Sequence, residues 1–227
     1  MVKKILKWLV RCCVLCVAAS VFLTALYIVF NPPLTPLMII RAKDSLSRGK
    51  GVSIHKRWRS YDDVSPALLR AVIAAEDTKF SEHEGFDWQA IEKAQQRNER
   101  RRDKKLYGAS TISMQTAKNV FLWPSRSYVR KALEAYFTVL IELLWTKKRI
   151  LEVYVNVIEW GDGIYGAETA ARTYFGKSAS GLTTYEAALM AAVLPNPRRW
   201  SPAAPTRYVE KRRSIIQSRM YSVSLPE

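Results

Sequence analysis

The segment AVIAAEDTKFSEHEGFD, residues 71–87, predicts the helix and the polar loop around which the rest of the chain is organised. Its first half continues an apolar helical run that begins after Ser65, a good helix cap, and Pro66, which suits the first helical position. The run ends on Glu76 and Asp77, where carboxylates face the negative end of the helix macrodipole. Because such breaks of a local rule tend to lie at functional sites, the segment is a candidate site, with a solvated helix end as the alternative.

Composition limits the class of protein. A chain of 227 residues that is 48% hydrophobic can form a membrane anchor and one compact domain of ordinary size. The net charge of +16 suits an anionic partner such as nucleic acid, phospholipid headgroups or a phosphorylated substrate. All three cysteines (Cys12, Cys13 and Cys16) lie in the N-terminal apolar segment, so the remainder of the chain cannot contain a disulfide, a thiolate nucleophile or a zinc–thiolate site.

The N-terminal segment predicts a membrane anchor. Cys12 to Phe30 carries no charged residue and, as a helix, spans about 28 Å, close to the hydrocarbon thickness of about 30 Å. Four basic residues precede it, so we expect the N-terminus in the cytoplasm and the domain on the opposite side. The apolar run continues well beyond the small residues 17–20, which favours an uncleaved anchor over a cleaved signal peptide. This topology counts against a nucleic-acid partner.

Helical periodicity dominates the rest of the chain, and the predicted fold class is mainly α. We divide the chain into a cytoplasmic tail (1–11), a transmembrane signal anchor (12–30), a linker (31–51) and a domain (52–222). The helices expected in the domain cover 66–76, 88–96, 112–121, 128–145, 147–160, 168–175, 183–194 and 209–220. One small hairpin is compatible with this fold class, at a position that the sequence does not indicate, and the glycine-containing segment 161–166 is expected to end the helix over 147–160.

Two charged features carry alternative interpretations. The segment from Arg97 to Lys105 has six basic residues and no apolar one, which predicts either a solvated loop or an electrostatic guide toward phosphates or anionic lipid. Arg130 and Glu134 are spaced i, i+4 on a predicted helix. This spacing predicts a surface ion pair worth a few tenths of a kcal/mol.

The residues alone favour sugar transfer from a diphosphate donor. The sequence has no His-Glu-x-x-His, Gly-x-Ser-x-Gly, Walker or Gly-x-Gly-x-x-Gly motif. Well-placed carboxylates are typical of glycoside chemistry, and lysine and arginine on neighbouring helices can stabilise a phosphate. A diphosphate donor already has a good leaving group, so its reaction needs one base for the incoming hydroxyl and cations for the departing diphosphate.

Five motifs resemble the signatures of the peptidoglycan glycosyltransferases, glycosyltransferase family 51. Residues 76–87 resemble E-D-x-x-F-x-x-H-x-G-x-D, and residues 108–119 (GASTISMQTAKN) resemble G-x-S-T-I-x-Q-Q-x-x-K-N. Residues 130–134 resemble R-K-x-x-E, residues 150–156 with the following glycine loop resemble the fourth signature, and residues 187–197 resemble A-A-x-L-A-x-x-L-P-x-P. Met114 replaces a common Gln and Val155 a common Leu. Neither position is charged, so we expect neither change to abolish activity.

The resemblance implies a lysozyme-like, two-lobed glycosyltransferase domain behind one transmembrane helix. It implies polymerisation of lipid II into β-1,4-linked glycan strands of peptidoglycan, with inversion and with undecaprenyl diphosphate as the leaving group. By the same resemblance Glu76 is the catalytic base and Glu134 a second essential glutamate near the donor diphosphate, which Lys118 and Arg130 hold. The other substrate-binding residues that it implies are Ser110, Thr111, Gln115, Asn119, Asp77, Phe80 and His83.

The resemblance also bears on cofactors, partners and location. No cofactor is expected to be required, and a divalent cation, Mg²⁺ or Mn²⁺, at the diphosphate is the open alternative. The expected location is the bacterial inner membrane, single-pass, with the domain in the periplasm, near cell-division or elongation proteins. Residues 121–123 with Tyr128 either dip into the membrane or pack in the core. The alternative functions are a lysozyme-like lytic enzyme acting on murein glycan and a non-catalytic scaffold for cell-wall assembly.

Overall fold

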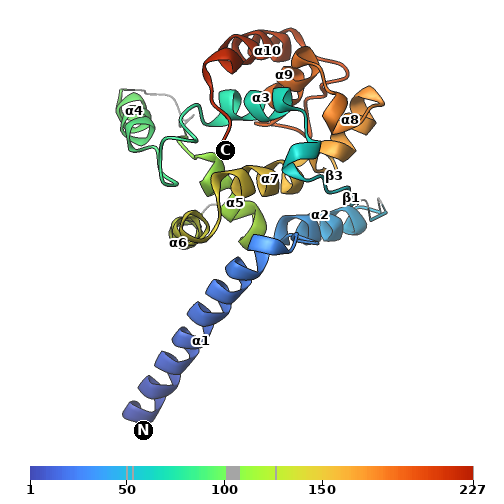
Figure 1. Cartoon of the computed structure of the whole chain (residues 1–227). Coiled ribbons are helices and arrows are strands. Elements are labelled where there is room, and N and C mark those ends of the chain that lie inside the picture. Colours follow the sequence, from blue (N-terminus) through green and yellow to red (C-terminus); the bar gives the residue numbers. More distant parts are fainter. Residues whose placement is uncertain (50, 53, 101–107, 126, 227) are drawn as a thin grey trace.

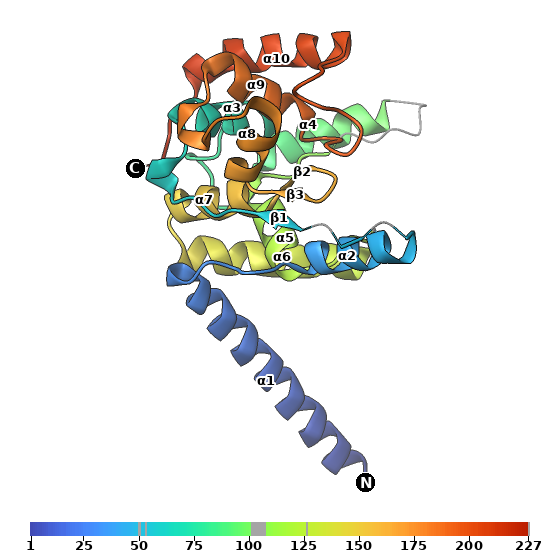
Figure 2. The same cartoon turned by 90° about the vertical axis from the view of Figure 1, so that its right-hand side faces the viewer.

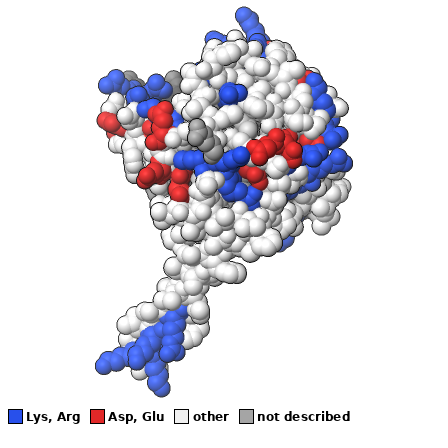
Figure 3. Space-filling model, viewed as in Figure 1, with Lys and Arg blue, Asp and Glu red and all other residues white. Residues whose placement is uncertain are grey.

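The computed structural model describes residues 1–49, 51–52, 54–100, 108–125 and 127–226. A long N-terminal helix, α1 (Val2–Val29), projects from a domain of shorter helices (Figure 1). The predicted cytoplasmic tail is therefore helical and continuous with the predicted anchor. Helix α1 is long and apolar enough to cross a membrane. Figure 3 shows its basic residues gathered at the free end, followed by a stretch without charge that reaches the domain.

The domain is mainly α, as predicted. Its helices are α2 (Pro36–Ser47), α3 (Pro66–Glu76), α4 (Trp88–Glu99), α5 (Ile112–Phe121), α6 (Tyr128–Leu144), α7 (Lys147–Val157), α8 (Ala167–Phe175), α9 (Thr184–Val193) and α10 (Arg207–Arg219). Three short strands, β1 (His55–Lys56), β2 (Glu159–Gly161) and β3 (Ile164–Tyr165), form a sheet in the order β1-β3-β2. Strand β3 pairs parallel to β1 and antiparallel to β2.

Local capping explains where the site-bearing helices begin. The side chain of Ser65 accepts a hydrogen bond from the backbone N–H of Ala67 at the start of α3. Thr111 and Ser127 cap α5 and α6 in the same way. The helix predicted over 147–160 is wrong at its end, because α7 stops at Val157 and the chain continues as β2. Strands β2 and β3 form a small hairpin, which was expected in the fold without a position.

Two groups of helices share one continuous core. Helix α3 packs against α9 and α10, and α5 packs against α6 and α7, which lie nearer to α1 in Figure 1. Large side chains buried between the elements include Trp160, Tyr154 and Phe80. The C-terminus of α3 therefore delivers its carboxylates toward α5, where the candidate site lies.

Part of the predicted linker is built into the domain. Thr35 caps α2 by accepting a hydrogen bond from the backbone N–H of Met38, which has no exposed surface. Helix α2 packs against α5. In Figures 1 and 2, α2 and α6 both lie in the layer of the domain nearest to α1.

The domain also holds the C-terminal half of α1. The indole N–H of Trp145 donates to the carbonyl of Thr24 at 2.8 Å, and Arg149 donates to the carbonyl of Phe30 at 2.9 Å. The hydroxyls of Ser20 and Tyr136 lie 2.7 Å apart. These contacts fix α1 against the middle and the end of α6 and the start of α7.

Candidate active site

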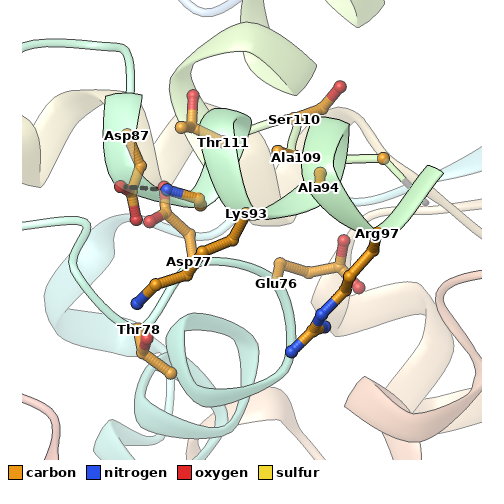
Figure 4. Close-up of a pocket in the computed structure, with 12 residues that line it drawn as sticks. Glu76, Asp77, Thr78, Asp87, Lys93, Ala94, Arg97, Ala109, Ser110 and Thr111 are labelled. Carbon is orange, nitrogen blue, oxygen red and sulfur yellow. Dashed lines mark hydrogen bonds between the residues drawn. The ribbon is translucent and has the colours of Figure 1, made fainter. Parts of the chain in front are cut away.

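Glu76 lies in a pocket at the C-terminus of α3. The pocket has a volume of about 260 Å³, and Figure 4 shows Glu76 and Asp77 on one side of it. Lys93 and Arg97 extend into it from α4, and Ser110 lies at its margin on the chain that leads into α5. A partly buried carboxylate beside open space and basic side chains can accept a proton from a bound hydroxyl group.

Two partly buried hydrogen bonds in series orient the carboxylate of Glu76. The amide nitrogen of Gln115 donates to Glu76 Oε2 at 2.8 Å, and the hydroxyl of Tyr154 donates to Gln115 Oε1 at 3.2 Å. Burial raises the pKa of Tyr154, and the charges of Glu76 and Asp77 act in the same direction. The phenol therefore keeps its proton, and its donation to Gln115 turns the amide N–H toward Glu76.

Gln115 was predicted to lie in the cleft, whereas Tyr154 was not. The only sequence signal was a hydroxyl-bearing residue between two valines of the fourth motif. Such a residue is usually a core tyrosine.

Asp77 joins the loop after α3 to the N-terminus of α5. Its carboxylate accepts a hydrogen bond from the backbone N–H of Ile112 at 2.9 Å and lies 3.0 Å from His83 Nε2. The acid that seemed misplaced at the end of one helix thus lies at the favourable, positive end of another. Thr111 donates to the carbonyl of Gly85 at 2.6 Å, and the ring of Phe80 is fully buried edge-on to His83.

These contacts give four of the predicted binding residues a mainly structural place. Asp77, Phe80, His83 and Thr111 shape the first loop. Asp77 and Thr111 also line the pocket, together with the exposed Ser110. The first motif therefore builds the wall that presents Glu76.

A second, basic pocket lies beside α5. Lys118, Asn119 and Arg130 line it, and its volume is about 530 Å³. Burial lowers the pKa of the Lys118 amine, while the carboxylate of Glu134 acts in the opposite direction. In the described part of the chain, no carboxylate lies within 4 Å of the Lys118 ammonium group. Its charge is therefore available to an anionic ligand.

Glu134 is buried and holds Arg130 in place. Only 2% of its surface is exposed, and its two carboxylate oxygens accept hydrogen bonds from Arg130 and from Lys131, the latter at 2.5 Å. The prediction of a surface ion pair is therefore wrong. The polar stripe of α6 faces the domain interior, while Leu143 on the other face is 75% exposed. Glu134 acts on the pocket through Arg130.

Three further predictions can be compared with the structure. Phe121 packs in the core, with its ring centroid 4.4 Å from that of Phe137, which agrees with the core-packing interpretation. Trp123 and Tyr128 are exposed, which agrees with the membrane-dipping interpretation. The basic segment begins as the last turn of α4, and residues 101–105 lie outside the described residues. Met114 and Val155, the two departures from the motifs, are both buried apolar side chains.

Comparison with known proteins identifies the family. The family model described as Transglycosylase matches residues 44–221. The biosynthetic peptidoglycan transglycosylase of Caulobacter vibrioides is 57% identical over 200 residues, covering 88% of this chain and 84% of that protein. The protein of the same name from Bdellovibrio bacteriovorus is 51% identical over 214 residues, covering 94% of this chain and 85% of that protein. The one from Xanthomonas campestris is 50% identical over 216 residues, covering 95% of this chain and 87% of that protein. These matches confirm the expected lysozyme-like, mainly α architecture. The chain belongs to the transglycosylase family and is a glycosyltransferase.

Proposed function

We propose that this protein polymerises lipid II into β-1,4-linked glycan strands of peptidoglycan, with inversion and with undecaprenyl diphosphate as the leaving group. The supporting observation is the arrangement on α5. Gln115 orients the carboxylate of Glu76 on one side. Lys118, three residues further along the helix, presents to the basic pocket a charge that no carboxylate of the described residues pairs with. The relatives are named for the synthesis of peptidoglycan, which agrees with this assignment.

In the proposed reaction, Glu76 takes the proton from the 4-hydroxyl of the acceptor sugar. The acceptor oxygen forms a bond to the anomeric carbon of the donor, and the bond from that carbon to the diphosphate breaks, leaving its electron pair on the diphosphate oxygen. A positioned base typically contributes about 10²–10⁴ in rate. Lys118 and Arg130 stabilise the charge that develops on the leaving group, and Glu134 keeps Arg130 oriented.

The membrane helix supports a lipid-linked substrate. Helix α1 suggests a membrane anchor, and its basic residues gather at the N-terminal end. We infer a single-pass protein of the bacterial inner membrane with its domain in the periplasm, where it meets lipid II and the growing glycan. Contact with cell-division or elongation proteins is part of the same proposal.

The basic pocket does not fit a resident divalent cation. Its lining includes no carboxylate, and no group of three or more His, Cys, Asp and Glu residues in the described ranges could hold a metal. Lysine and arginine side chains instead complement a diphosphate directly. We therefore propose that no protein-bound cofactor is required and that any Mg²⁺ or Mn²⁺ arrives on the diphosphate of the substrate.

The decisive experiment is polymerisation of lipid II by the purified full-length protein. We expect glycan polymer from the wild type and a loss of at least about 10²-fold with Glu76→Gln. Glu82→Gln, which changes an exposed acid of the same loop, is the matched control and should behave as the wild type. A Glu76→Gln variant with full activity would contradict the assignment of the base.

The same preparation separates the alternative functions. Release of fragments from mature murein, without polymer from lipid II, would identify a lytic enzyme. If the folded wild-type protein is inactive on both substrates, the remaining function is a non-catalytic scaffold for cell-wall assembly.

A further inference from the structure

The helix that follows the membrane anchor contributes to the basic pocket. Helix α2 packs against α5, buries its residue Met38 completely and begins at the Thr35 cap. Leu37 and Arg41 of α2 line the same pocket as Lys118 of α5. A segment that sequence analysis assigned to the linker thus forms one wall of the site.

Three cationic side chains converge on this pocket from three helices. Arg41 comes from α2, Lys118 from α5 and Arg130 from α6. The remaining lining residues are apolar, amide or hydroxyl side chains, and none is acidic. Glu134 pairs with Arg130 and Glu159 lies near Arg41, but both carboxylates lie outside the lining, so the cavity itself presents cationic groups and is complementary to an anionic ligand.

The guanidinium group of Arg41 has unused hydrogen-bonding capacity. Its only ion pair in the described part of the chain joins Arg41 Nε to Glu159 Oε2 at 3.5 Å, and this buried nitrogen makes no hydrogen bond there. Arg198 approaches the other oxygen of Glu159 at 3.9 Å. Glu159 therefore has a second cationic neighbour if Arg41 turns toward a ligand.

We propose that Arg41 binds the diphosphate of the donor together with Lys118 and Arg130. This inference rests on the proposed function, because it takes the basic pocket to be the site of the leaving group. A guanidinium presents several N–H donors in a planar fork that matches phosphate oxygens, which a lysine cannot reproduce. The donor site is then complete only when the segment next to the membrane is folded onto the domain.

The test compares variants of the full-length protein for lipid II polymerisation and for inhibition by inorganic pyrophosphate. Arg41→Ala should lower kcat/KM for lipid II by about 10- to 100-fold, in line with the loss of hydrogen bonds to a charged group. It should weaken inhibition by pyrophosphate to a similar extent, and Arg41→Lys should recover only part of either loss. Lys43→Ala, an exposed basic residue of the same helix, is the matched control and should match the wild type.

Glu159→Gln separates ligand binding from a structural ion pair. If Arg41 serves the ligand, this variant keeps kcat/KM and pyrophosphate inhibition near the wild-type values. If Arg41 only forms an ion pair with Glu159, then Arg41→Ala and Glu159→Gln should both lose activity and thermal stability. That result would overturn the inference. Thermal unfolding of each variant shows whether it is folded.

Lys118→Ala shows which proposal has failed. If Lys118→Ala greatly lowers kcat/KM for lipid II while Arg41→Ala keeps the wild-type value, the role of Arg41 is refuted and the proposed function stands. Wild-type values for both variants would show that the pocket does not bind the leaving group, and the proposed function would fail as well.

Discussion

The chain of hydrogen bonds behind Glu76 leads to a graded prediction. Tyr154→Phe removes one bond between neutral groups, worth about 0.5–1.5 kcal/mol, and should lower kcat/KM for lipid II by about 2- to 13-fold. Gln115→Ala removes the donor to the carboxylate itself, worth about 1.5–3 kcal/mol, and should lower kcat/KM by about 10- to 150-fold. Both losses should be smaller than that of Glu76→Gln, because the base remains present.

The assay is the initial rate of polymerisation over a range of lipid II concentrations, with thermal unfolding measured for each variant. Tyr165→Phe is the matched control, because Tyr165 is fully buried and its hydroxyl has no hydrogen-bond partner among the described residues. In the double variant, Tyr154→Phe should add no further loss to Gln115→Ala, since it acts only through Gln115. A wild-type rate for Tyr154→Phe together with a slow Gln115→Ala variant would refute the reasoning. Additive losses of kcat/KM in the double variant would refute it as well.

Three further predictions concern charge and packing. Burial acts to raise the pKa of Glu168, but hydrogen bonds, first among them that from Arg59, outweigh burial and hold the pKa at about 2. Glu168→Gln should therefore lower the free energy of unfolding by about 3 kcal/mol at pH 7. This loss should become progressively smaller as the pH falls from 4.5 toward 2. Burial lowers the pKa of Lys118, so activity should decline at a lower alkaline pH than it would if this lysine had its ordinary pKa. In a pH–rate profile, Lys118→Arg should move this decline to higher pH. Gly85 has a φ of +87°, and a Cβ there would lie 2.8 Å from Thr138 Cγ2, so Gly85→Ala should lower the melting temperature and the polymerisation rate together, whereas an unchanged melting temperature would contradict this.

Helix starts could be predicted because capping is local. Ser65, Thr111 and Ser127 each accept a hydrogen bond from a backbone N–H only two or three residues further along the chain, so the signal lies within one turn. The orientation of α6 could not be predicted in this way. Its pattern shows a polar and an apolar face but not which one meets the domain, and the buried face turned out to carry Glu134.

The site was predictable only as far as its motifs reach. Glu76, Lys118 and Arg130 were predicted from the resemblance and line the two pockets. Tyr154 was missed because its role depends on Gln115, 39 positions away, and on burial that no local pattern records. Arg41 was missed because it lies outside the motifs and reaches the pocket only through the packing of α2.

If α1 spans the membrane as proposed, its contacts with the domain determine how deeply the domain enters the bilayer. If the segment from Cys12 to Phe30 fills a hydrocarbon layer of about 30 Å, then Ser20, ten residues before Phe30, lies about 15 Å below the outer boundary. Tyr136 reaches Ser20, and Trp145 reaches Thr24, about 9 Å below the same boundary. In the proposed orientation, with the domain in the periplasm, the start of α7 and the middle of α6 would lie within the outer leaflet, and the exposed side chains of Val139 and Leu143 would meet acyl chains instead of water.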